Sequence, residues 1–136
     1  MPKYAIKEIE ACIGTDITVY KLIVDDNCEF DEFENKYYND PNYEREFLTL
    51  ITRLEQSSYI GEKSLLPETK FKDITPEKDP IKEYEVKTHN LRLYLFKFEN
   101  RGRIVVCGGR KDSQKKDLRH FRNIKTNFLE KHGGIK

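Results

Sequence analysis

Basic side chains gather between residues 87 and 116, and they are the groups in this sequence best suited to chemistry on a phosphodiester. Three lie on segments that alternate like strands, at Lys87, Arg92 and Lys97. Four more follow the next apolar segment: Arg110, Lys111, Lys115 and Lys116. Cations on a rigid sheet beside a basic loop suit contact with a phosphate backbone. We therefore expect these seven cations to converge on one end of a sheet, although any one of them alone could be the polar side of a half-exposed sheet.

Charge is divided unevenly along the 136 residues, whose formal net charge is only +1. Residues 1–68 hold 7 Lys and Arg against 15 Asp and Glu, whereas residues 69–136 hold 18 against 9. The stretch 87–136 is more basic still, with 14 basic residues against 4 acidic ones. Such asymmetry indicates a polyanionic partner for the basic half, and the alternative is two solvated faces of opposite sign.

Nucleotide and metal chemistry have less support. The run Gly108-Gly109-Arg110-Lys111 lacks the other residues of a phosphate-binding loop, so we expect its glycines to release the chain from a strand, with positive φ. The three histidines do not have the spacing of metal ligands, since they fall in a predicted turn, a helix and a tail: His89, His120 and His132. We expect neither a metal nor a cofactor.

Three cysteines stand far apart, form no Cys-x-x-Cys pair, and each adjoins an apolar run: Cys12, Cys28 and Cys107. Core positions in a reduced protein are the expectation. No apolar run is long enough for a membrane span, and the charged residues 1–8 do not form the apolar centre of a secretory signal. We therefore expect a cytoplasmic protein that makes no contact with a membrane.

Hydrophobic periodicity predicts one α+β domain over residues 1–136. Its C-terminal part is predicted to be an antiparallel meander whose middle strand is the innermost of the three. The last helix has an apolar face and a basic face. The predicted elements are a strand pair at 3–24, two helices at 28–57 packed on the sheet, a loop at 58–80, the three-strand meander at 81–109 and a helix at 112–131.

The order of residues in the meander resembles a known family. An Arg-bearing strand comes first, Leu91-Arg92-Leu93-Tyr94, and a hydrophobic strand, two glycines and a turn with Lys and Gln follow, Ile104-Val105-Val106-Cys107-Gly108-Gly109-Arg110-Lys111-Asp112-Ser113-Gln114. This order resembles the RelE/ParE superfamily of toxins from type II toxin–antitoxin systems, in particular its phage-derived, HigB-like branch. The match spans about residues 81–130, and it implies a RelE-like fold with residues 3–24 as additional strands.

The resemblance implies a small ribonuclease that needs no metal and cuts mRNA, usually on the ribosome, until a cognate antitoxin of helix-turn-helix type neutralises it. It matches the family's strand Lys to Lys87 and its next-strand Arg to Arg92. The chain departs from the family at Glu85, where many members carry a second Lys, and on the terminal helix, where Arg119 and His120 stand in place of a Tyr.

Together these observations define two sets of candidate residues. Cations can stabilise a phosphorane, and His can transfer protons near neutral pH. The candidate catalytic residues are Lys87, His89, Arg92, Lys111 and His120. The candidate RNA contacts are Lys97, Arg110, Lys115, Lys116 and Arg119.

Other functions remain open at this stage. A protein with the toxin fold could act by binding, as a gyrase-poisoning relative or an inactive regulator that binds nucleic acid, or it could be a scaffold with no toxicity. The acidic N-terminal half could also shield the basic site within the same chain, so that deletion of residues 1–25 would increase RNA binding.

Overall fold

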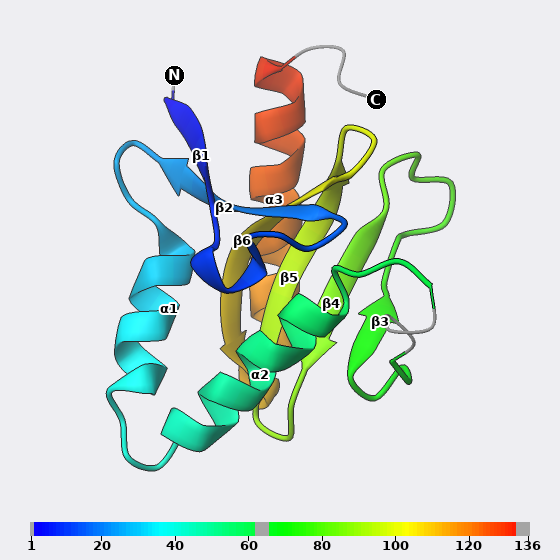
Figure 1. Ribbon diagram of the computed structural model, residues 1–136. Helices are drawn as coiled ribbons and strands as arrows, with labels where there is room; N and C mark the ends of the chain where they lie inside the picture. The colour runs from blue at the N-terminus through cyan, green and yellow to red at the C-terminus, as the bar shows by residue number, and fades with distance from the viewer. Residues whose placement is uncertain (1, 62–65, 133–136) are drawn as a thin grey trace.

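The computed structural model describes residues 2–61 and 66–132, and a six-stranded sheet runs through their centre (Figure 1). The strand order is β1-β2-β6-β5-β4-β3. The strands are β1 (Tyr4–Glu8), β2 (Thr18–Val24), β3 (Phe71–Asp73), β4 (Glu83–Lys87), β5 (Leu91–Phe98) and β6 (Gly102–Arg110). The fold is therefore α+β, as the sequence predicted.

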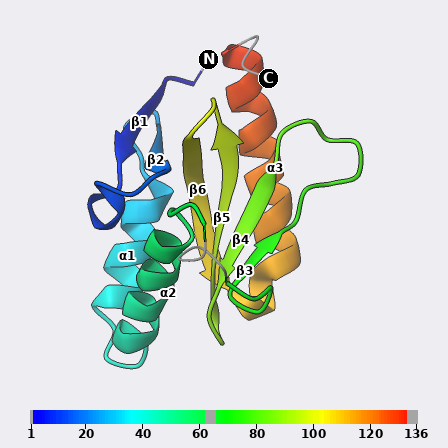
Figure 2. The same cartoon turned by 45° about the vertical axis from the view of Figure 1, so that its right-hand side comes forward.

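Helices cover both faces of the sheet (Figure 2). α1 (Glu29–Tyr38) and α2 (Glu44–Gln56) lie on one face, and α3 (Gln114–Lys131) lies on the other. The two helices predicted at 28–57 and the helix predicted at 112–131 are thus confirmed, and a short 3-10 turn precedes α3 at Lys111–Ser113. Each face has its own buried apolar cluster, so the molecule has three layers.

The predicted meander of β4, β5 and β6 is confirmed, and β5 pairs with both of its neighbours. β5 is apolar on both faces because both are covered. Leu93 and Leu95 pack toward α1 and α2, whereas Tyr94 and Phe96 pack toward α3. Successive side chains of a strand point to opposite faces, so β5 joins the two apolar clusters.

The prediction of an antiparallel sheet is wrong at one pair, because β2 runs parallel to β6. β1 and β2 form the predicted antiparallel pair, but β1 ends at Glu8 and a 3-10 turn follows at Glu10–Cys12. This turn places Ile9 and Cys12 in the core beneath α2. The N-terminal strands lie beside the first half of β6 and do not cover its far end. These strands therefore do not supply the shield over the basic residues that the sequence left open.

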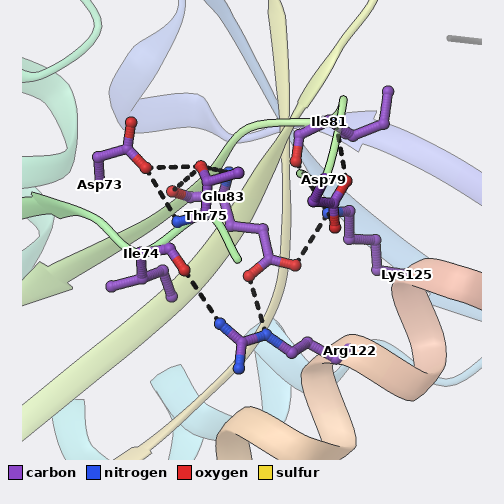
Figure 3. Close-up of polar contacts among 8 residues, drawn as sticks. All are labelled: Asp73, Ile74, Thr75, Asp79, Ile81, Glu83, Arg122 and Lys125. Carbon is purple, nitrogen blue, oxygen red and sulfur yellow. Dashed lines mark hydrogen bonds and ion pairs between the residues drawn. The ribbon is translucent and has the colours of Figure 1, made fainter. Parts of the chain in front are cut away.

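The segment predicted as a loop at 58–80 also contains an element of the sheet, the three-residue strand β3, which pairs with the outer edge of β4. The chain after β3 is tied to α3 by ion pairs, of which the pair of Glu83 with Lys125 is buried (Figure 3). The carboxylate of Glu83 accepts hydrogen bonds from Arg122 Nε at 3.0 Å and from Lys125 Nζ at 2.8 Å. Lys125 Nζ also donates to the carboxylate of Asp79 at 3.0 Å. This Glu83 ion cluster, formed by Asp79, Glu83, Arg122 and Lys125, fixes α3 against β4.

Candidate nucleic-acid interface

The turn between β4 and β5 brings several of the predicted residues together. Lys87 is the register partner of Arg92 across the two strands, and His89 is exposed on the turn between them. The end of β6 is joined to the same turn, since the backbone N–H of Lys111 donates to Asn90 O at 2.8 Å. We call the group formed by Lys87, His89, Asn90, Arg110 and Lys111 the turn site.

Helix α2 holds the turn site from the face of the sheet that it covers. The carboxylate of Glu46 accepts hydrogen bonds from the Thr88 hydroxyl, the backbone N–H groups of Asn90 and Leu91, and the Asn90 side chain. Arg53 donates from Nη1 to the carbonyl of Lys87 at 2.7 Å. A turn whose backbone groups are bonded to a packed helix is held in one conformation, so His89 stands on a rigid support.

These hydrogen bonds also change the acidity of Glu46. Its partial burial would raise the pKa of the carboxyl group. Four hydrogen bonds from Thr88, Asn90 and Leu91 outweigh that effect because they stabilise the carboxylate, and the pKa of Glu46 is lowered. The turn is therefore bound by a charged side chain at neutral pH.

Arg92 holds the turn from the opposite face of the sheet. Its guanidinium is buried, with a residue exposure of 8%, and Nη1 donates to the carbonyls of Thr88 and Leu91. Arg92 Nε has no hydrogen-bond partner in the part of the chain that the structure describes, and it lies 4.0 Å from the buried carboxylate of Glu85. The predicted catalytic Arg92 therefore supports the turn and does not stand free on the surface.

Glu85 is the centre of a small polar cluster beneath the turn site. It accepts a hydrogen bond of 2.8 Å from Gln114 of α3 and lies 3.9 Å from Lys87 Nζ. The hydroxyl of Tyr94 is also buried there without a hydrogen-bond partner among the described residues, and burial raises its pKa. Lys87 is only partly covered by this cluster, and its side chain keeps an exposure of 19% at the rim.

The end of β6 forms a shallow hollow of about 270 Å³ beside the turn, lined by Asn90, Arg110, Lys111 and Asp112. Arg110 lies over the ring of Tyr43, 5.7 Å from its centroid, and 3.7 Å from Asp112. Lys111 is exposed. The hollow thus offers two cations and one carboxylate next to His89.

The expected role of the two glycines is wrong, because both belong to β6 and neither has positive φ. They are needed for close approach. A Cβ on Gly108 would lie 2.8 Å from Arg92 O and 2.8 Å from the ring of Phe33, and one on Gly109 would lie on the Asp117 carboxylate. The glycines therefore let α1 and α3 pack on the two faces of β6.

Helix α3 extends the basic surface from the turn site. Its first residue, Gln114, contacts Glu85, so the exposed cations of its first two turns lie near the same end of the sheet: Lys115, Lys116 and Arg119. Six of the seven cations expected to converge therefore lie at this end, although Arg92 is buried there. Arg122 and Lys125, farther along the helix, belong to the Glu83 ion cluster (Figure 3).

Lys97 and His120 do not join the turn site. Lys97 lies at the other end of β5, opposite Arg103, and on the sheet face that α1 and α2 cover. Arg103 there is half-buried and lies over the rings of Phe71 and Tyr84. His120 lies on α3 and its Nε2 is 2.8 Å from the Glu29 carboxylate of α1. The two candidate histidines are thus on different elements, and of the two only His89 belongs to the turn site.

Two of the three cysteines occupy the core positions that the sequence predicted. Cys12 and Cys107 are buried in the core, where burial raises the pKa of both thiols, that of Cys12 to about 12. Cys28 is half-buried at the start of α1.

Within the ranges 2–61 and 66–132, no set of three or more His, Cys, Asp or Glu side chains is placed to bind a metal ion. None of the helices in these ranges combines the length and apolar character needed to cross a bilayer. Comparison with known proteins adds no relationship: no family model, curated protein or solved structure matches this chain.

Proposed function

We propose that this protein binds single-stranded RNA along the turn site and the first turns of α3, and that it is a RelE-like toxin that cleaves mRNA on the ribosome without a metal. The observation that supports the proposal is that Lys87 and His89 on the braced turn lie beside Lys111, which is hydrogen-bonded to that turn from the end of β6, and that the exposed cations of α3 continue the group. A rigid array of cations suits the regular charges of a phosphate backbone.

The proposed reaction uses the ribose hydroxyl of the RNA as the nucleophile. The 2′-oxygen attacks the adjacent phosphorus and loses its proton to a base, while the bond from phosphorus to the 5′-oxygen breaks. The leaving 5′-oxygen takes a proton from an acid, so the products are a 2′,3′-cyclic phosphate and a 5′-hydroxyl. His89 is the group suited to proton transfer, and Lys87 and Lys111 are suited to stabilising the charged phosphorane.

In this proposal Arg92 is a positioning residue, and so is Glu46. Both hold the backbone of the turn that carries His89, from opposite faces of the sheet. Catalytic groups must be held within fractions of an ångström of their working geometry, and a clamped turn meets this requirement.

A second candidate function is RNA binding without cleavage, as in an inactive regulator. Two observations favour it. The guanidinium of Arg92 is buried and directed to backbone carbonyls, and His120 is bonded to Glu29 and does not face the turn site. Cleavage would then rest on His89 alone, whereas binding needs only the exposed cations.

Induced expression in bacteria, with mapping of mRNA 5′ ends, tests the proposal. We expect growth arrest and new 5′-hydroxyl ends with the natural chain, and loss of both with His89→Ala and with Lys111→Gln. Lys97→Gln is the matched control, since it removes an exposed lysine at the opposite end of β5 and should leave cleavage unchanged.

Three results would change this conclusion. Growth arrest with intact mRNA and damaged DNA would support a gyrase-directed toxin. RNA binding with no cleavage and no growth arrest would support the inactive regulator. Loss of cleavage in Lys97→Gln to the same degree as in Lys111→Gln would remove the turn site from the proposal.

Restoration of growth by a co-expressed helix-turn-helix protein from the neighbouring reading frame would identify the proposed antitoxin.

A further inference from the structure

The second half of β6 has an open edge. β2 pairs with β6 only from Gly102 to Val105, and a bulge in the pairing with β5 follows directly, between Tyr94 and Leu95. Within the described residues, no strand pairs with residues 106–110 on the side away from β5. An unpaired edge presents backbone N–H and C=O groups to whatever lies beside it.

The pairing with β5 indicates which of these groups face the open side. Lys111 N–H donates to Asn90, and the N–H and C=O of Leu91 are directed to Thr88. Because residues of an antiparallel strand alternate in the direction of their backbone groups, Gly108 and Arg110 direct theirs away from β5. The Arg110 carbonyl accepts from the Ser113 hydroxyl at 3.1 Å. Among residues 2–61 and 66–132, the N–H and C=O of Gly108 and the N–H of Arg110 therefore remain for another chain.

A groove of about 410 Å³ runs along this edge, between α1 and the start of α3. Glycines at 108 and 109 leave the backbone accessible at its floor. Carboxylates outnumber cations in its walls, with Glu29, Glu32, Asp112 and Asp117 against Lys36 and Arg110.

Three of these carboxylates already have partners, since Glu29 contacts His120, Asp112 contacts Arg110, and Asp117 accepts from Ser113. Glu32 has no side-chain partner among the described residues and is exposed on the first turn of α1. The excess of negative charge favours a basic occupant over an acidic one.

We infer that this groove binds an extended, lysine- or arginine-bearing segment of a partner protein, which adds to the sheet as a strand beside β6. Backbone hydrogen bonds to Gly108 and Arg110 supply the pairing, and the carboxylates of the groove select basic side chains. The proposal does not rest on the ribonuclease function, because the groove lies on the other side of β6 from its partner β5 and shares with the turn site only Arg110, which is not a proposed catalytic group.

Titration of the full chain with synthetic peptides, followed by amide hydrogen exchange in NMR, tests this inference. The probe is an acetylated and amidated heptapeptide in which lysine alternates with valine. We expect the Gly108 and Arg110 amides to exchange rapidly in the free protein and about tenfold more slowly with the peptide, as expected for one added hydrogen bond each. A heptapeptide that alternates glutamate with valine should give no protection.

Two matched controls separate strand addition from simple charge attraction. The lysine peptide N-methylated at alternate positions keeps its charge but loses the donors needed for pairing, so one of its two methylation patterns should abolish protection. Glu32→Lys should weaken binding about tenfold, whereas Glu34→Lys, the same change two residues along α1 and outside the groove, should not.

Several outcomes would overturn the inference. The Gly108 amide could be protected already in the free protein, which would mean that the edge is closed. The lysine peptide could fail to bind, or it could bind equally well with either pattern of N-methylation. Equal effects of Glu32→Lys and Glu34→Lys would assign the binding to the general charge of α1.

Discussion

Glu83 illustrates how a single buried charge is accommodated in this protein. It is 1% exposed, and it contacts the charged groups of both Arg122 and Lys125. A carboxylate in such a place is stable only while its partners remain, because desolvation of an unpaired charge costs several kcal/mol. The cluster that contains Glu83 also ties the segment after β3 to α3 (Figure 3).

We predict that Lys125→Ala destabilises the protein by about 3 kcal/mol, at the lower end of the range for a broken buried pair because Arg122 still contacts Glu83. Urea unfolding followed by circular dichroism measures the change. Lys131→Ala, an exposed lysine on the same helix, should change the free energy of unfolding by less than about 0.5 kcal/mol. The double variant Glu83→Gln with Lys125→Met should recover part of the loss, and equal losses in Lys125→Ala and Lys131→Ala would contradict this account.

At the scale of elements, α2 acts as a brace for the turn between β4 and β5. Its residues Glu46 and Arg53 reach the two ends of that turn, although they lie more than thirty positions away in the sequence. The carboxylate of Glu46 accepts hydrogen bonds from backbone N–H groups that would otherwise be unpaired in a partly buried place. Leaving such a donor without a partner costs free energy of folding. The conformation of His89 therefore depends on a helix with no residue in the turn site.

This brace should be sensitive to acid. Because the pKa of Glu46 is lowered in the folded protein, its contribution to stability is present above its unfolded pKa of about 4.3 and is lost as pH falls through the lower folded value. We predict that Glu46→Gln destabilises the protein at pH 7 and flattens the decline in stability below pH ~4. The decline should flatten only in part, since the pKa values of Asp73 and Asp79 are lowered as well.

Unfolding free energies from pH 2.5 to 7 and exchange rates of the Asn90 and Leu91 amides measure this effect. Glu44→Gln is the control, an exposed position two residues earlier on the same helix with no contact to the turn. An unchanged pH profile in Glu46→Gln, or faster Asn90 exchange in Glu44→Gln, would show that the brace is not formed by Glu46.

The sequence predicted most elements because their periodicity is local. Alternation predicted β4 and β5, a short apolar run predicted β6, and the recurrence of Phe30, Phe33 and Tyr37 predicted α1. The parallel pairing of β2 with β6 joins segments that are far apart in the sequence, and no local pattern of residues predicts it. β3 is only three residues long, too short for a periodic pattern, and the chain that follows it is bonded to Arg122 of α3, forty-eight positions away.

The candidate site was predictable to the extent that hairpin register determines it. Lys87 and Arg92 face each other because a short turn joins their strands. Lys97 could have been separated from them, since it is five residues from Arg92 and therefore on the opposite face of the same strand. The contact of Glu46 with the turn could not be predicted from the sequence. A carboxylate on the exposed part of an amphipathic helix does not differ in its pattern from a solvated charge.

At the scale of the molecule, the sheet separates an acidic helical layer from a basic one. α1 carries four acidic residues and one lysine, whereas α3 carries six lysines and arginines against two acidic residues. The near-neutral total thus hides a dipolar molecule, and α1 and α3 lie on opposite sides of the sheet (Figure 2). A polyanion approaching this field is drawn toward α3 and the turn site.

Salt dependence provides a test of that arrangement. With 2′-O-methylated single-stranded RNA, which cannot be cleaved, the affinity should fall as salt rises, because bound phosphates release their counterions. We predict that the triple variant Lys115→Gln, Lys116→Gln, Arg119→Gln lowers the slope of log affinity against log salt by about 2, from three contacts at ~0.7 each. Fluorescence anisotropy over a range of KCl concentrations measures the slope. The control variant Lys7→Gln with Lys36→Gln removes two cations from the acidic side of the molecule and should leave the slope unchanged. An equal loss of slope in both variants would mean that RNA binding responds to the net charge of the protein and that the RNA has no defined path along α3.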